Sequence, residues 1–205
     1  AAIAWQNVAY NQPPHAGFYM EPDMALPVPL VFTGSKWQGS AGANDWNLTT
    51  PNFVRADGAP ATFENGDTAI FSFDGIHNET VTLPEDIAPG LTVVASPDDY
   101  TLGGDGSLTG NMNLYKTQKG TLRLTGTHSY SGKTIVTDGA LVVDGSLENS
   151  KVFVSGGTWG GKNAGPGQGG RIGGSGRLGN GLVVQTRGTL MPGMQQRDTL
   201  FIENG

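Results

Sequence analysis

Paired carboxylates, the groups with which many polysaccharide-cleaving enzymes work, are the first chemistry to look for in this acidic chain. Asp98 and Asp99 are adjacent, in the segment SPDDY. On a strand, neighbouring side chains point to opposite faces, so these two carboxylates could not act as a pair. The segment also has the composition of a turn. Other acidic residues lie scattered near the ends of predicted strands, and a pair assembled from distant segments stays open: Asp67, Asp74, Glu79, Glu85 and Asp86.

No other catalytic or metal-binding set is recognisable. His15, His77 and His128 are flanked by turn residues and lack metal-ligand spacing, so we expect them at the surface or in turns. The chain has no cysteine, which excludes disulfides, thiolate metal sites and a cysteine nucleophile. No serine-hydrolase elbow or zinc-protease motif occurs, and GGDGS (103–107) is too short for a calcium-binding repeat array. We therefore predict no catalytic residue, no metal site and no cofactor.

Aromatic residues are the remaining candidates for a binding role. Tyrosine and tryptophan can stack on sugars, but packing and capping uses are more common. Trp37 and Trp46 are expected to be packing anchors. Among the others, Trp159 and Tyr130 are the candidates for contact with a ligand, and Tyr100 and Tyr115 complete the group.

Composition limits the class of protein. The 205 residues are enough for one sizeable domain, and 33 of them are glycine. A net charge of −6 and a pI near 4.9 argue against nucleic-acid binding, which needs clustered Lys and Arg. Arg171, Arg177 and Arg187 are spaced like solvated surface residues. No segment is long and apolar enough for a membrane helix.

Residues 1–35 differ from the rest of the chain. They contain Pro13, Pro14, Pro22, Pro27 and Pro29, which exclude a regular helix and disfavour a central strand. Aromatic residues lie among these prolines, so the segment is not typical of a disordered tail. We predict an extended arm that links the chain to an upstream module.

Residues 36–205 predict an all-β domain. Short alternating segments at 67–73, 79–85 and 91–96 are bounded by Gly, Pro or Asp, and no helical period is sustained. Similar segments that begin with glycine then recur, with starts seventeen to nineteen residues apart: GTLRLTG at 120–126, GALVVDG at 139–145 and GGTWGG at 156–161. This period favours a parallel β-helix, a solenoid with one coil per repeat. In it, Leu122 and Leu124 should stack on Leu141 and Val143.

Residues 117–147 resemble a known repeat. GTLRLTGTHSYSGKTIVTDGALVVDGSL is similar to the autotransporter-associated β-strand repeat of bacterial type V secreted proteins, which typically reads Gly-Thr-Leu-x-Leu-Thr-Gly-x-Asn-x-Tyr-x-Gly-x-Thr-x-Val-x-x-Gly-x-Leu-x-Val. His128 replaces the usual Asn, a departure that we interpret as a surface turn. The matching positions are Gly120, Thr121, Leu122, Leu124, Thr125, Gly126, Tyr130, Gly132, Thr134, Val136, Gly139, Leu141 and Val143.

The resemblance implies a right-handed parallel β-helix in the passenger of an autotransporter, secreted or held at the bacterial cell surface. It implies an upstream effector module, with a subtilisin-like serine protease the leading variety, and a C-terminal membrane β-barrel, neither of which is in this chain. The last residues, DTLFIENG, look like part of a coil, so we expect truncation or processing. The absence of cysteine suits translocation of an unfolded chain, in which disulfides would be obstacles.

Three functions follow from these expectations. The first is a non-enzymatic stem that folds outside the cell and presents the effector module. The second is a surface adhesin that binds a host glycan or protein, and the third is a polysaccharide-acting enzyme.

Overall fold

The computed structural model describes residues 34–39, 44–73, 79–156, 169–192 and 199–203. The predicted arm at 1–35 lies almost wholly outside these residues. Within them every regular element is a β-strand, so the expected all-β class is confirmed. No helix that could cross a membrane occurs in this part of the chain.

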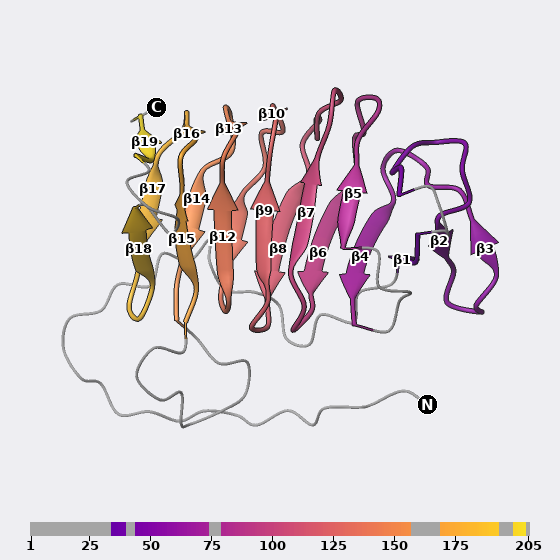
Figure 1. The fold of residues 1–205 in the computed structure, drawn as a ribbon, viewed down its shortest axis with the longest axis horizontal. Helices are drawn as coiled ribbons and strands as arrows, with labels where there is room; N and C mark the ends of the chain where they lie inside the picture. The colour runs from indigo at the N-terminus through magenta and orange to yellow at the C-terminus, as the bar shows by residue number, and fades with distance from the viewer. Residues whose placement is uncertain (1–33, 40–43, 74–78, 157–168, 193–198, 204–205) are drawn as a thin grey trace. The chain divides into compact units, whose positions relative to one another are not determined.

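Nineteen strands in the described residues form three sheets (Figure 1). The six-stranded sheet contains β5 (Thr80–Thr82), β7 (Tyr100–Gly103), β9 (Thr121–Leu124), β12 (Ala140–Val143), β15 (Arg171–Gly174) and β18 (Thr189–Pro192). The four-stranded sheet contains β10 (Thr127–His128), β13 (Ser146–Leu147), β16 (Arg177–Leu178) and β19 (Phe201–Ile202). The nine-stranded sheet contains β1 (Ser35–Trp37), β2 (Phe53–Val54), β3 (Pro60–Ala61), β4 (Thr68–Ser72), β6 (Leu91–Ala95), β8 (Asn113–Thr117), β11 (Thr134–Val136), β14 (Val152–Val154) and β17 (Leu182–Val184).

The strands stack in parallel as a β-solenoid of about five turns. Figure 1 shows β5, β7, β9, β12, β15 and β18 succeeding one another across the molecule. Leu141 pairs in register with Leu122, and Val143 pairs with Leu124. All four side chains are fully buried. The predicted parallel β-helix and its stacked aliphatic residues are therefore confirmed.

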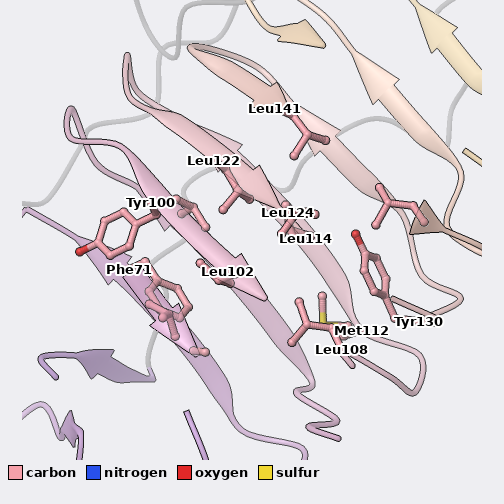
Figure 2. Packing of buried hydrophobic residues seen from close by; sticks show 14 of the residues in the cluster. Phe71, Tyr100, Leu102, Leu108, Met112, Leu114, Leu122, Leu124, Tyr130 and Leu141 are labelled. Carbon is pink, nitrogen blue, oxygen red and sulfur yellow. The ribbon is translucent and has the colours of Figure 1, made fainter. Parts of the chain in front are cut away.

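The core consists of columns of inward side chains, one from each coil (Figure 2). In the nine-stranded sheet, Phe71 pairs with Val94, and farther along Val136 pairs with Val154. Alternate residues of these strands face outward, since successive side chains of a strand point to opposite faces. Burial of so many aliphatic and aromatic side chains is the main stabilising term, at about 25 cal/mol per Å² of apolar surface.

The N-terminal end of the solenoid is closed. There, β2 pairs antiparallel with β1 and with β3, so β2 and β3 extend the nine-stranded sheet beyond β1, and Pro60 lies in the outermost strand. Thr82 of β5, the first strand of the six-stranded sheet, exchanges backbone hydrogen bonds with the segment at 44–46. Six buried aromatic rings pack under this closure, with centroids 5.1 to 6.4 Å apart: Trp37, Trp46, Phe53, Phe63, Phe71 and Tyr100. The expected anchoring by Trp37 and Trp46 is confirmed.

Coil length varies more than the sequence repeats indicate. Thr121 pairs with Ala140, nineteen residues later, as expected. Ala140, however, pairs with Arg171, thirty-one residues later. The next strand in that sheet is thus β15, and not GGTWGG at 156–161, most of which lies outside the described residues. A longer connection therefore separates two coils whose strands still keep a common register.

Short polar side chains fasten successive coils at their turns. A side-chain oxygen of one coil accepts a hydrogen bond from a backbone N–H of the next, in place of the interrupted strand ladder. Asp99 accepts from Thr121 in this way, at 2.6 Å, and Asn113 accepts from Lys133 at 2.8 Å. Asp98 and Asp99 lie between strands, as their sequence indicated. The same contact recurs for Asn65 with Ala88, Asp86 with Ser107 and Asp144 with Ser175.

Gly139, at the corner before β12, should tolerate no side chain. Its φ is +71°, and a Cβ there would meet the backbone oxygens of Gln118 and Gly120 and lie 2.7 Å from the Lys116 Nζ. Gly58 has a similar φ of +84° but open space around it. We expect Gly58→Ala to cost about 1–2 kcal/mol of unfolding free energy from backbone strain alone. Gly139→Ala should cost at least about 1 kcal/mol more, because backbone must also shift. Urea unfolding of both variants checks this, and equal costs would contradict the packing at this corner.

Candidate functional site

Of the candidate aromatics, Trp37, Trp46 and Tyr100 all pack against Phe71. Trp159, His15 and His77 lie outside the described residues. Trp37, Trp46, Tyr100 and Tyr130 are all buried, which agrees with packing uses for these aromatics. Tyr115 is on the outer face of β8, where it is half-buried and pairs in register with Val93 and Ile135. In the parts of the chain that the structure describes, no three His, Asp or Glu residues gather in a way that could hold a metal ion.

Tyr130 is the candidate whose surroundings are most informative. Its side chain is fully buried, in the same packed cluster as Leu108 and Met112 (Figure 2). Burial raises the pKa of its hydroxyl to about 12, partly opposed by side-chain hydrogen bonding with Thr134 and Ser150. A residue without exposed surface cannot stack on a sugar, so the ligand-contact interpretation of Tyr130 does not hold.

A buried chain of hydroxyl groups starts at Tyr130. Its hydroxyl lies 2.6 Å from the Thr134 Oγ1, which lies 2.7 Å from the Ser150 Oγ. Ser150 then lies 2.6 Å from the carbonyl oxygen of Gly132. A carbonyl can only accept, so Ser150 donates to Gly132, Thr134 donates to Ser150 and Tyr130 donates to Thr134. Each buried hydroxyl is thereby satisfied, and the turn before β11 is joined to the segment before β14.

This geometry explains part of the repeated motif. Tyr130, Gly132 and Thr134 are alternate residues, and all three take part in the chain of hydrogen bonds. Gly132 also lies against the Met112 backbone of the preceding coil, and a Cβ at Gly132 would overlap the Met112 carbonyl oxygen. The Tyr-x-Gly-x-Thr pattern is therefore a structural corner, in which a glycine lets two coils approach closely.

His128 corrects the expectation of a surface turn. The side chain is fully buried, and its Nδ1 accepts a hydrogen bond from the Leu108 N–H of the preceding coil at 3.1 Å. Desolvation lowers the pKa of His128 to about 4, although the backbone of Thr125 opposes part of the shift. Turn residues flank His128 in the sequence, but its side chain faces inward.

Lys116 was not singled out from the sequence. It occupies a place in an aliphatic column, paired in register with Val94 on one side and Val136 on the other. The stem is buried, and the ammonium group reaches the corner, where it donates to the carbonyl oxygens of Thr117 (2.9 Å), Gln118 (2.7 Å) and Asp138 (3.4 Å). Desolvation lowers the pKa of Lys116 to about 8, while the nearby Asp138 and Asp99 act in the opposite direction.

Tyr130, His128 and Lys116 lie in the part of the chain that matches a known family. Residues 114–143 match the passenger-associated-transport-repeat. Together with the β-solenoid, this match fits the β-helix of an autotransporter passenger. The repeat begins in β8 and ends in β12, so it contains Lys116, His128 and the Tyr130 corner. Comparisons with curated proteins and with solved structures gave no match.

The match confirms the resemblance inferred from residues 117–147. It implies that the full protein carries a linked translocator domain and suggests that this part is secreted or exposed at the cell surface. Lys116, His128, Tyr130 and Thr134 of the repeat are buried, and each makes a hydrogen bond to backbone or to another of these buried side chains. The arrangement therefore supports coil-to-coil cohesion.

The hydroxyl chain should be most sensitive at its middle. Tyr130→Phe removes one donor and leaves Thr134 bonded to Ser150, so we expect a loss of about 1 kcal/mol of unfolding free energy. Thr134→Val removes the central link and leaves the buried Tyr130 hydroxyl unpaired, with an expected loss of about 2–3 kcal/mol. Denaturant unfolding of the two variants measures the order, and a Tyr130→Phe cost above that of Thr134→Val would contradict the hydrogen-bond chain.

Lys116 should make stability rise with pH in the alkaline range. Its pKa is about 8 in the folded chain and near 10.5 when unfolded, so the unfolded chain binds more protons between these values. The free energy of unfolding should therefore increase by roughly 2 kcal/mol from pH 8 to pH 10. Lys116→Met supplies the control, since subtracting its pH profile removes the titration of all other groups. Identical profiles for the two proteins would show that Lys116 is not held in this environment.

Proposed function

We propose that this chain is a non-enzymatic stem of an autotransporter passenger, which folds outside the cell and holds an effector module away from the membrane. The observation that supports it most directly is the position of the transport repeat inside a continuous parallel solenoid. A solenoid makes most of its contacts between neighbouring coils, so it can form coil by coil as a chain emerges. The absence of cysteine is consistent with this route.

The two ends of the solenoid are compatible with a stem that lies between an effector module and a membrane translocator. At the N-terminal end the outermost strand, β3, is two residues long and contains Pro60, which limits pairing with another chain. This lets a module of a different fold precede the solenoid. By inference from the family resemblance, that module is a subtilisin-like serine protease. At the other end, large apolar side chains of β17, β18 and β19 are exposed, and a further coil leading toward a membrane translocator would cover them: Val184, Leu190, Met191, Phe201 and Ile202.

The stem hypothesis predicts that the fold matters and individual outer side chains do not. Leu141 is fully buried, whereas Thr101 and Arg123 lie on the outer face of the same sheet. In cells that make the full-length protein with an N-terminal epitope tag, Leu141→Asp should reduce surface display at least tenfold. Thr101→Ala should leave display unchanged. Flow cytometry with an antibody to the tag measures both, and circular dichroism of the purified chains reports whether the β-fold persists.

The same cells distinguish the alternatives. If the isolated chain binds host cells and a substitution on an outer face abolishes binding without altering the fold, the chain is an adhesin. If it releases unsaturated products from a polysaccharide, it is an enzyme. Normal display of Leu141→Asp would contradict the stem itself, because a charge in the aliphatic column should prevent the coil from closing.

A further inference from the structure

His128 takes the place of an aliphatic residue in the interior of the four-stranded sheet. It pairs in register with Leu147, which pairs with Leu178, and Leu178 pairs with Ile202. Leu147 and Leu178, like His128, are fully buried. In the strand columns of the described solenoid, the other polar side chains that face inward are those of Lys116, Ser35, Thr92 and Thr134. Within the residues that the structure describes, the imidazole is therefore the one inward group whose ordinary pKa lies between pH 5 and 8.

The hydrogen bonds define the protonation state of His128. Its Nδ1 faces a backbone N–H, that of Leu108, so it must be the unprotonated acceptor and the ring proton must lie on Nε2. The Nε2 is buried and has no hydrogen-bond partner within the described residues. The hydrogen bond from Leu108 thus links the neutral imidazole to the preceding coil, and the Thr125 backbone also acts on the ring.

The groups that surround His128 offer no compensation for a positive charge. On one side of β10, the neighbouring strand β13 contributes Ser146 and Leu147. On the other side, the preceding coil contributes Ser107 and Leu108. Tyr130, two residues along the chain, remains a neutral hydroxyl because burial raises its pKa to about 12. Among the described residues no carboxylate contributes to the titration of His128, on which only burial and the Thr125 backbone act.

We propose that His128 is an acid-sensitive latch between two coils of the repeat, closed when the imidazole is neutral and released when it takes up a proton. The new proton must bind Nδ1, because it is the ring nitrogen that carries no proton in the neutral form. It then points at the Leu108 N–H, so an acceptor becomes a donor and the hydrogen bond is lost. The charged ring is also left in an apolar column, which favours an open form that lets water reach it.

The opening of the latch should be local and should affect the residues whose backbone contacts Leu108. Its carbonyl accepts hydrogen bonds from the backbone N–H groups of Ser129 (3.0 Å) and Tyr130 (3.1 Å). Ile87 of the coil before pairs with Leu108 in an isolated parallel bridge. Acidification should therefore expose the amides of residues 108, 129 and 130 first, and leave β9 and β12 of the six-stranded sheet protected.

The size of the effect follows from the two pKa values of His128, about 4 in the closed form and 6.5 when exposed. Between pH 7 and pH 4 the equilibrium constant for opening should rise by roughly a hundredfold. His128→Asn is the matched variant, because its side-chain oxygen can accept from Leu108 and does not titrate near these pH values. It is also the residue that the resembled repeat carries at this position.

Hydrogen exchange followed by NMR tests the latch in the whole chain. After correction for the intrinsic rate, exchange of the Leu108 amide in the wild-type chain should accelerate by roughly a hundredfold from pH 7 to pH 4. In His128→Asn it should change by less than about tenfold over the same range. Exchange of the Leu122 amide, in β9, should depend on pH equally in both proteins.

A second measurement keeps the proposal testable if His128→Asn does not fold. Titration of the wild-type imidazole by NMR should give a midpoint below pH 5 for His128. A midpoint near 6.5 would overturn the proposal, as would Leu108 exchange that is independent of pH in the wild-type chain. Acid acceleration of the same size in His128→Asn would overturn it too, since another group would then be responsible.

Discussion

Each coil of this solenoid depends on its neighbours for both its backbone hydrogen bonds and its packing. The parallel register places like positions of successive coils one above the other, so a residue such as Leu122 has Leu141 as its permanent neighbour. One face of every strand must then be apolar and compact, and the turns must bring their free N–H groups to side-chain acceptors such as Asp99. Fold and stability are both consequences of this register.

Polar groups inside the columns are compatible with the register only where they find partners. Lys116 satisfies its ammonium group with three backbone carbonyls, and the hydroxyls of Tyr130, Thr134 and Ser150 end on the carbonyl of Gly132. His128 is only half satisfied. All of these except Ser150 lie within the matched repeat, residues 114–143. The repeat therefore fixes its coils by specific hydrogen bonds in addition to the less directional packing of leucine and valine.

The sequence predicted the architecture because its strongest signals are local and periodic. The segments predicted as strands at 67–73, 79–85 and 91–96 contain β4, β5 and β6. The nineteen-residue spacing between GTLRLTG and GALVVDG equals the length of one coil. The long connection after β14 could not be predicted, because a solenoid accepts an insertion at a turn without losing register. Burial of His128 was missed because local composition describes the backbone turn and says little about which side of it a side chain takes. Lys116 was missed since a lone lysine in a strand usually faces solvent.

The unlike ends of the solenoid have a consequence for assembly. Stacking of copies end to end would need a strand edge that accepts a partner at each extremity. At the extremity formed by β3, the outermost strand is two residues long and contains Pro60. Short edge strands and proline limit pairing with another chain, so this extremity is a poor template for a second copy.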